Sequence, residues 1–146
     1  MKKLINYFVL FTVLLLTSAI ASADIAVIVS QNSKLSNFTY RNVKDLYTGR
    51  TMVVGDSSVA LPLDISANSG LRNSFYVALT GMSGLQATGY WTKMMVTGQA
   101  SPPQYVQTEE AMINDVKTNE TAIGYIPAND VRPDIGVRVL FIIKTS

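Results

Sequence analysis

The sequence predicts a single α/β domain, a sheet flanked by helices. Its 146 residues match the length of one ordinary domain. An apolar fraction of 48% with a charged fraction of 15% excludes a disordered chain. Short apolar runs rich in β-branched residues alternate along the chain with amphipathic segments. We find no internal repeat and no interdomain linker, so we expect one domain.

The N-terminal segment has the order of a secretory signal peptide. Lys2 and Lys3 precede an apolar run at 7–16, and the small-residue site Ala21-Ser22-Ala23 follows. The run is about half of the ~20 residues that a membrane-spanning helix needs. We therefore expect cleavage of residues 1–23, leaving an exported domain at 24–146 that is not inserted in a membrane. An uncleaved membrane anchor is the alternative.

Charge and composition exclude several functional classes. Without Lys2 and Lys3, the mature chain has ten basic and ten acidic residues. It therefore lacks the positive field that binding to nucleic acid or an anionic membrane usually needs. The absence of Cys excludes thiolate nucleophiles and Cys-ligated zinc, and the absence of His removes the commonest general base and the commonest metal ligand. We see no nucleophile–base pair, so we predict no enzyme activity, no metal and no cofactor.

The elements follow from local patterns in chain order. A nearly continuous apolar run at 25–29 is typical of a strand covered on both faces. Thr39 is a plausible N-cap for a helix to about Tyr47, which Gly49 ends. Apolar runs at 52–54 and 59–63 predict a hairpin around the turn 55–58. The later segments predict a polar stretch at 64–70, helices at 71–79 and 85–96, an extended connector at 101–103, a helix capped by Thr108, and strands at 122–126 and 137–143.

The polar stretch that leaves one strand and opens the next helix is the best candidate ligand site. Free N–H groups of a first helical turn, the positive end of the helix dipole and nearby hydroxyls suit an oxyanion. Asn68 and Ser69 offer polar side chains, Gly70 leaves room for a ligand, and Arg72 could add a charge. The alternative is an ordinary capped helix start with a solvated Arg72.

The loop after the first strand is the second candidate. Ser30 and Asn32 follow a buried strand, and loops at the carboxyl ends of strands are favoured binding positions in open α/β sheets. The alternative is an ordinary polar connection. Glu109 and Glu110 fit the first turn of a helix, where negative charge offsets the dipole.

Taken together, these segments resemble the periplasmic phosphate-binding proteins, the substrate-binding proteins of phosphate ABC transporters. The stretch 25–49 resembles their "v…N…v..Lt..ql..if.G" pattern, and Ser69-Gly70 with Phe75 resembles their "SGT…F" anion loop and helix. The later elements at 97–103 and 122–126 resemble their "G…P" and "aIGYv" segments. The resemblance covers nearly all of the mature chain. It implies one lobe of a type 2 periplasmic-binding-protein-like fold, with a central mixed sheet flanked by helices, and a periplasmic solute-binding module for phosphate or a similar oxyanion.

Two departures from the family pattern bear on function. The family has two lobes that close on the ligand, whereas this chain resembles mainly one. The family also has an Arg four residues before the Ser of its anion loop and a Thr after the Gly, where this chain has Ile65 and Leu71. We therefore expect millimolar or absent phosphate binding by a monomer, unless a second copy or an envelope protein completes the cleft. The alternative function is a protein-interaction or assembly component of the cell envelope with a vestigial ligand loop.

Overall fold

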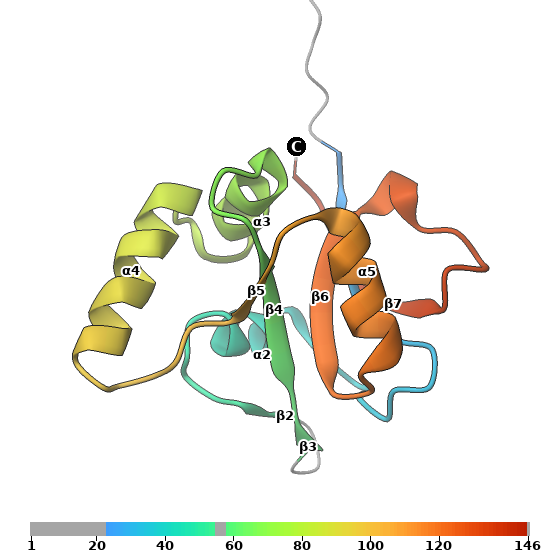
Figure 1. Cartoon of the computed structure of the whole chain (residues 1–146), viewed down its shortest axis with the longest axis horizontal. Coiled ribbons are helices and arrows are strands. Elements are labelled where there is room, and N and C mark those ends of the chain that lie inside the picture. Colours follow the sequence, from blue (N-terminus) through green and yellow to red (C-terminus); the bar gives the residue numbers. More distant parts are fainter. Residues whose placement is uncertain (1–22, 55–57, 146) are drawn as a thin grey trace, which may run out of the picture.

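The structure is a computed structural model that describes residues 23–54 and 58–145. Except for its last residue, the predicted signal peptide lies outside these residues. Five strands form the main sheet in the order β5-β4-β6-β1-β7 (Figure 1). They are β1 (Ile25–Ser30), β4 (Leu61–Ile65), β5 (Gln104–Val106), β6 (Ala122–Pro127) and β7 (Val137–Ile143).

The sheet is mixed, as predicted. Strand β4 runs parallel to both β5 and β6, whereas β1 runs antiparallel to β6 and β7. Leu61 pairs with Ala122 and Leu63 pairs with Gln104. Two parallel strands of one sheet must be joined by a crossover. The chain therefore passes from β4 to β5 through two helices, and from β5 to β6, on the other side of β4, through one helix. This topology fixes which loops share an edge of the sheet.

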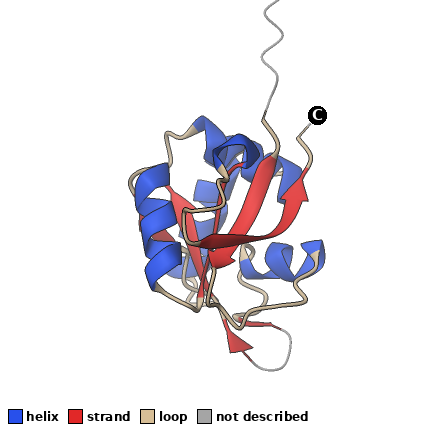
Figure 2. Ribbon diagram, turned by 90° about the vertical axis from the view of Figure 1, so that its right-hand side faces the viewer, coloured by secondary structure: helices blue, strands red, loops and turns tan. Residues whose placement is uncertain are grey.

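Helices cover both faces of the sheet (Figure 2). A Cβ atom on Gly124 of β6 would contact Met112 of the helix after β5. The next residue, Tyr125, instead stacks on Phe75 at 3.7 Å between ring centroids. Since successive residues of a strand point to opposite faces, these helices lie on opposite sides. The helices are α2 (Tyr40–Leu46), α3 (Gly70–Thr80), α4 (Gly84–Val96), α5 (Glu109–Thr118) and the short 3₁₀ helix η1 (Ala128–Asp130).

The two N-cap residues predicted from the sequence are confirmed. The hydroxyl of Thr39 accepts the N–H of Asn42, and the hydroxyl of Thr108 accepts the N–H of Ala111. The predicted helix stop is also confirmed, since Gly49 adopts a left-handed φ of 69°. A Cβ atom there would lie 2.8 Å from that of Ala100. Gly49 is therefore required both by its backbone conformation and by close packing.

The predicted hairpin is only partly right. A small hairpin forms between β2 (Val53–Val54) and β3 (Ser58–Val59), but the residues after Ala60 leave it and enter the main sheet as β4. The connector at 101–103 leads directly into β5, a short strand that the sequence did not predict. Pro62 has no backbone N–H to donate to a neighbouring strand. It is tolerated within β4 because the pairing of β4 with β5 begins only at Leu63, so no hydrogen bond to β5 is lost at Pro62. Among the described residues, no helix is long and apolar enough to cross a membrane.

Candidate functional site

The carboxyl ends of β4, β5 and β6 lie along one edge of the sheet because these three strands are parallel. The segment 66–69 follows β4 and leads into α3, the end of β5 leads into α5, and β6 leads into η1. Ligands of open α/β sheets bind outside the carboxyl ends of the strands. The predicted anion loop therefore lies at the edge that favours binding.

Helix α3 begins without a side-chain cap. Ser69 is its N-cap residue, with an extended backbone at φ −75° and ψ 128°, yet its hydroxyl accepts no first-turn N–H. By contrast, the N-cap hydroxyls of α2, α4 and α5 each accept one. Because the first N–H groups of a helix have no partner within the helix, those of α3 remain available to a ligand or water.

Gly70 lies at the first position of α3 and is exposed. A Cβ atom on Gly70 would meet nothing within 4 Å, and its φ is not among the positive ones. Neither crowding within the described chain nor backbone conformation therefore requires glycine here. Asn68 is also exposed and Ser69 is half-buried. The predicted residues 68–70 thus form one accessible surface.

Arg72 does not share that surface, because its side chain is fully buried. Its Nε donates to a carboxylate oxygen of Asp64 at 2.9 Å. One terminal nitrogen donates to the carbonyl of Gly84 at 2.7 Å and the hydroxyl of Thr88 at 3.0 Å. The other donates to the hydroxyl of Tyr105 at 3.3 Å. Arg72 is therefore neither solvated nor turned toward a ligand, and its charge is neutralised in the core.

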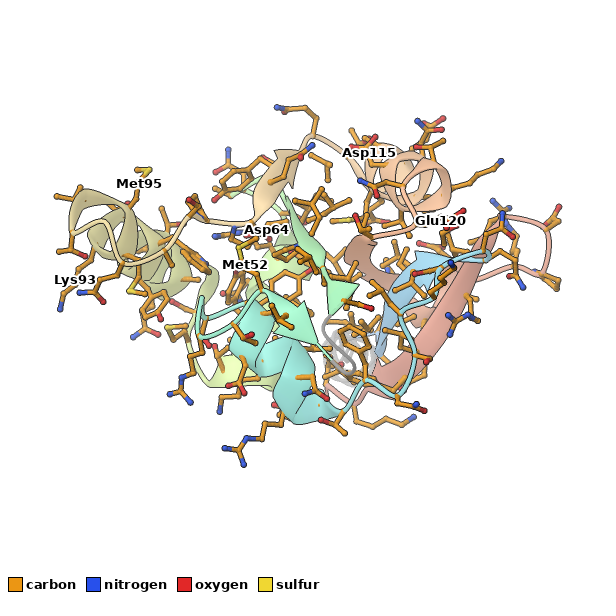
Figure 3. All side chains as sticks on the ribbon, turned by 90° about the horizontal axis from the view of Figure 1, so that it is seen from below. Met52, Asp64, Lys93, Met95, Asp115 and Glu120 are labelled. Carbon is orange, nitrogen blue, oxygen red and sulfur yellow. The ribbon has the colours of Figure 1, made fainter. Side chains whose placement is uncertain are left out.

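Asp64 anchors this buried network and lies in the interior in Figure 3. Besides Arg72, it accepts the hydroxyl protons of Tyr125 at 2.5 Å and Tyr76 at 3.1 Å. The indole of Trp91 donates to the Tyr76 oxygen at 3.1 Å. Burial, and then the negative charge of Asp64, raise the pKa of Tyr76 and Tyr125. The network therefore keeps both tyrosines as neutral donors.

Ser30 and Asn32 lie at the other end of the sheet. Since β1 is antiparallel to β6 and β4 is parallel to β6, the end of β1 lies at the same edge of the sheet as the start of β4. About 16 Å of strand β4, five residues long, separates that end from the anion loop. The Ser30 hydroxyl is buried and donates to the carbonyl of Lys117. The two predicted loops therefore do not line one site.

An acidic cavity occupies the predicted binding edge near η1. Its volume is about 470 Å³, and Glu109, Glu110 and Asp130 line it together with Arg132. Burial, and then the neighbouring Asp130, raise the pKa of Glu109. At neutral pH, this part of the edge repels an anion. Glu109 and Glu110 do lie in the first turn of α5, as predicted.

A second cavity of about 300 Å³ lies at the opposite end of β4 and is mainly apolar, with Leu46, Leu61 and Pro62 in its wall. It does not include the anion loop. Among the residues that the structure describes, no group of three or more acidic side chains could hold a metal ion.

Three solved structures share this fold. They are an ABC-type phosphate transport receptor from Vibrio cholerae (20% identity, TM-score 0.61), a structure described as a phosphate ABC transporter substrate-binding protein with bound phosphate from Clostridium perfringens (22%, 0.61), and PstS from Borrelia burgdorferi (18%, 0.59). No family model matches the sequence, and no curated protein sequence matches it significantly.

The match covers 81% of this chain in all three comparisons but only 44–46% of the other chains. The chain thus has the fold of phosphate ABC transporter substrate-binding proteins over less than half of their length. This confirms the predicted resemblance at the level of the fold and is consistent with a single lobe. Identities near 20% leave the ligand to be argued from the site.

Proposed function

We propose that this chain is a non-enzymatic solute-binding lobe that holds a small oxyanion, such as inorganic phosphate, against the first turn of α3. The observation that carries the proposal is the open helix start. Ser69 leaves the first-turn N–H groups uncapped, and nothing in the described chain occupies the space beside Gly70. Such a turn combines free donors with the positive end of the helix dipole.

The donors of this site are neutral. The backbone N–H groups of Gly70 and Leu71 would face the anion, and the Ser69 hydroxyl and Asn68 amide would add two side-chain donors. Neither expected cation joins them, because Arg72 is bound to Asp64 and the position of the family Arg is occupied by the buried Ile65. The ligand is therefore recognised by hydrogen bonds and a dipole alone.

These contacts support only weak binding to an isolated chain. Three or four hydrogen bonds to a charged ligand contribute roughly 1.5–3 kcal/mol each. Association itself costs about 4–15 kcal/mol, and a millimolar constant corresponds to about −4 kcal/mol. A ligand on one lobe also stays half in water, where attraction is weak. We expect a millimolar constant for the monomer and tighter binding only when a second protein covers the ligand.

The setting that we propose is the periplasm, after removal of residues 1–23. There a second copy or an envelope partner, such as a component of an ABC transporter, would complete the cleft. The chain shares its fold with less than half of the length of the related chains.

Thermal melting with inorganic phosphate tests the proposal, using sodium chloride at equal ionic strength as the control. Ser69→Ala should reduce the phosphate-dependent rise in melting temperature. It should hardly change the melt without phosphate, because the Ser69 hydroxyl caps no N–H group. Equal phosphate shifts in both proteins would exclude Ser69 from the site. A low-micromolar constant in a proven monomer would contradict the weak-binding argument.

A second function is favoured by one observation, the burial of Arg72 against Asp64. A chain whose anion loop lacks the family Arg and Thr, and whose own Arg72 is turned into the core, could serve as a protein-interaction or assembly component of the cell envelope. No phosphate response up to tens of millimolar, together with capture of a specific envelope protein, would favour this function.

A further inference from the structure

Gly89 is a second helical glycine that nothing in the described chain explains. It lies near the middle of α4, where glycine weakens a helix relative to alanine. A Cβ atom at Gly89 would meet nothing within 4 Å, whereas one at Gly84 in the same helix would lie 3.3 Å from the Cα atom of Asn73. Its φ is not positive either. Neither packing within the described chain nor backbone conformation therefore accounts for glycine at this position, and we look for the reason in a contact with another molecule.

The outer face of α4 carries an apolar stripe centred on Gly89. Leu85 is 83% exposed and Val96 is 78% exposed, although both are large and apolar. At about 100° per residue, Leu85, Gly89, Thr92 and Val96 fall within roughly 60° of arc on one face. Ala87 and Trp91 hold the opposite face against the core. Figure 1 shows α4 at one extremity of the molecule, so this stripe is not covered by another described element.

The stripe is self-complementary. Along α4 the stripe begins and ends with a large side chain, Leu85 and Val96, and has the smaller Gly89 and Thr92 between them. The successive spacings are four, three and four residues, so the pattern is the same in both directions. If two α4 helices meet in antiparallel orientation about a two-fold axis between Tyr90 and Trp91, Leu85 of one copy faces Val96 of the other. Gly89 then faces Thr92 at the crossing, where small residues allow two helices to approach closely. The same patch serves both copies, as a two-fold interface requires.

We propose that the outer face of α4 is a docking surface for a second copy of this chain, packed antiparallel through Leu85, Gly89, Thr92 and Val96. Charge permits this pairing. Lys93 is the one charged residue of α4, and it lies on the flank of the stripe and not within it. Figure 3 shows Lys93 and Met95 projecting from the end of α4 away from the body of the molecule.

The association is expected to be weak. One helix per copy buries less surface than the ~1,200 Å² of a stable complex, so the contact belongs with transient interfaces. It would matter at high local concentration, or where another contact brings two copies together. This inference does not rest on oxyanion binding, since α4 contributes none of the proposed donors.

Disulfide trapping tests the register, because the chain has no cysteine of its own. Two single variants of the full chain, Leu85→Cys and Val96→Cys, are mixed under mild oxidation. We expect the mixed 85–96 disulfide to exceed either homodimer at least fivefold, since in the antiparallel pair two Leu85 positions lie about 16 Å apart along the axes. Val77→Cys, on the half-exposed face of α3, is the matched control for random collision.

Predominant 85–85 and 96–96 products, or 85–96 yields no higher than those of the control, would overturn the proposal. A second variant guards against effects on folding. Gly89→Gln should raise the melting temperature, because glutamine favours helix and the space is open, and it should lower the 85–96 yield at least fivefold by obstructing the crossing. An unchanged yield in this variant would also contradict the proposed packing.

Discussion

The start of α3 at Ser69 and Gly70 differs from Arg72, in the same turn of the helix, in exposure, packing and hydrogen bonding. At Ser69 and Gly70 the chain is accessible, uncapped and loosely packed, and its donors are not used within the helix. At Arg72 the chain is buried and fully bonded to Asp64, Gly84, Thr88 and Tyr105. The first region leaves helix donors available to a ligand or water. The second holds α3, α4 and the sheet together.

The difference shows that a charged residue near a candidate site need not serve it. A buried cation costs several kcal/mol in lost hydration unless it is paired and hydrogen-bonded. Once Asp64 and its neighbours have satisfied Arg72, turning its side chain out to a ligand would leave Asp64 as an unpaired buried charge. The predictions below test each region against the other.

The largest effect is expected in the buried region. Arg72→Ala should lower the free energy of unfolding by about 3–5 kcal/mol, because it leaves the Asp64 carboxylate uncompensated in the core. Urea unfolding measures this change. The control is Lys144→Ala, which breaks an exposed ion pair with Asp24 and should hardly move the urea midpoint. Equal changes in both variants would contradict the importance of the buried pair.

Alkaline pH should also act on the buried region. Burial raises the pKa of Tyr47, Tyr76 and Tyr125 above their ordinary value of 10. The folded state then binds more protons than the unfolded state above pH 10, so stability is intact below pH 10 and falls above it by about 1.4 kcal/mol per tyrosine and pH unit.

Tyrosinate absorbance near 295 nm and circular dichroism follow this titration together. Tyr47, Tyr76 and Tyr125 should ionise only as the chain unfolds. Ionisation of these three tyrosines in the folded protein would show that the network around Asp64 is open to water.

In the open region, one substitution should raise the stability of the fold and abolish its response to phosphate. Ser69→Asp supplies the missing N-cap and a negative charge at the helix start, so it should stabilise the fold by about 0.5–1 kcal/mol. The same carboxylate occupies the first-turn donors and repels an oxyanion, so the thermal response to phosphate should vanish.

The matched control is Ser83→Asp, at the N-cap of α4, where the serine already accepts an N–H. It should leave the phosphate response intact. Loss of the response in both variants would point to nonspecific charge repulsion.

The smallest effect concerns the acidic cavity beside the open region. Burial and Asp130 raise the pKa of Glu109 above 4.5, so its contribution to stability is present at low pH and is lost as pH rises through the raised pKa. Glu109→Gln should flatten this slope in melting curves at pH 4–7, with a change of a few tenths of a kcal/mol near the helix dipole. An unchanged slope would contradict a raised pKa of Glu109.

The sequence was sufficient for the alternation of strands and helices and for the position of the open loop. Apolar periodicity located β1, β6, β7 and the four helices, and hydroxyl side chains marked two of the caps. The sequence pattern places Asp64 in the polar stretch 64–70, whereas the structure includes it in β4. Its carboxylate is satisfied there by hydrogen bonds from Arg72, Tyr76 and Tyr125, which local sequence patterns do not reveal.

The burial of Arg72 left a signal that could have been used. Phe75, Tyr76 and Leu79 lie three, four and seven residues after it, which places Arg72 on the core-facing stripe of α3. The separation of Ser30 from Ser69 left no such signal. It depends on the direction of β1 within the sheet, which local patterns do not specify.

The most direct test of the central claim is a titration of the ¹⁵N-labelled chain with inorganic phosphate, followed at the backbone amides of Gly70 and Leu71. Binding by neutral helix donors predicts saturable shifts at these two amides in the millimolar range, without shifts at the Arg72 side chain or at Ser30. Unchanged Gly70 and Leu71 amides up to about 50 mM phosphate, well above the millimolar constant expected here, would contradict the claim.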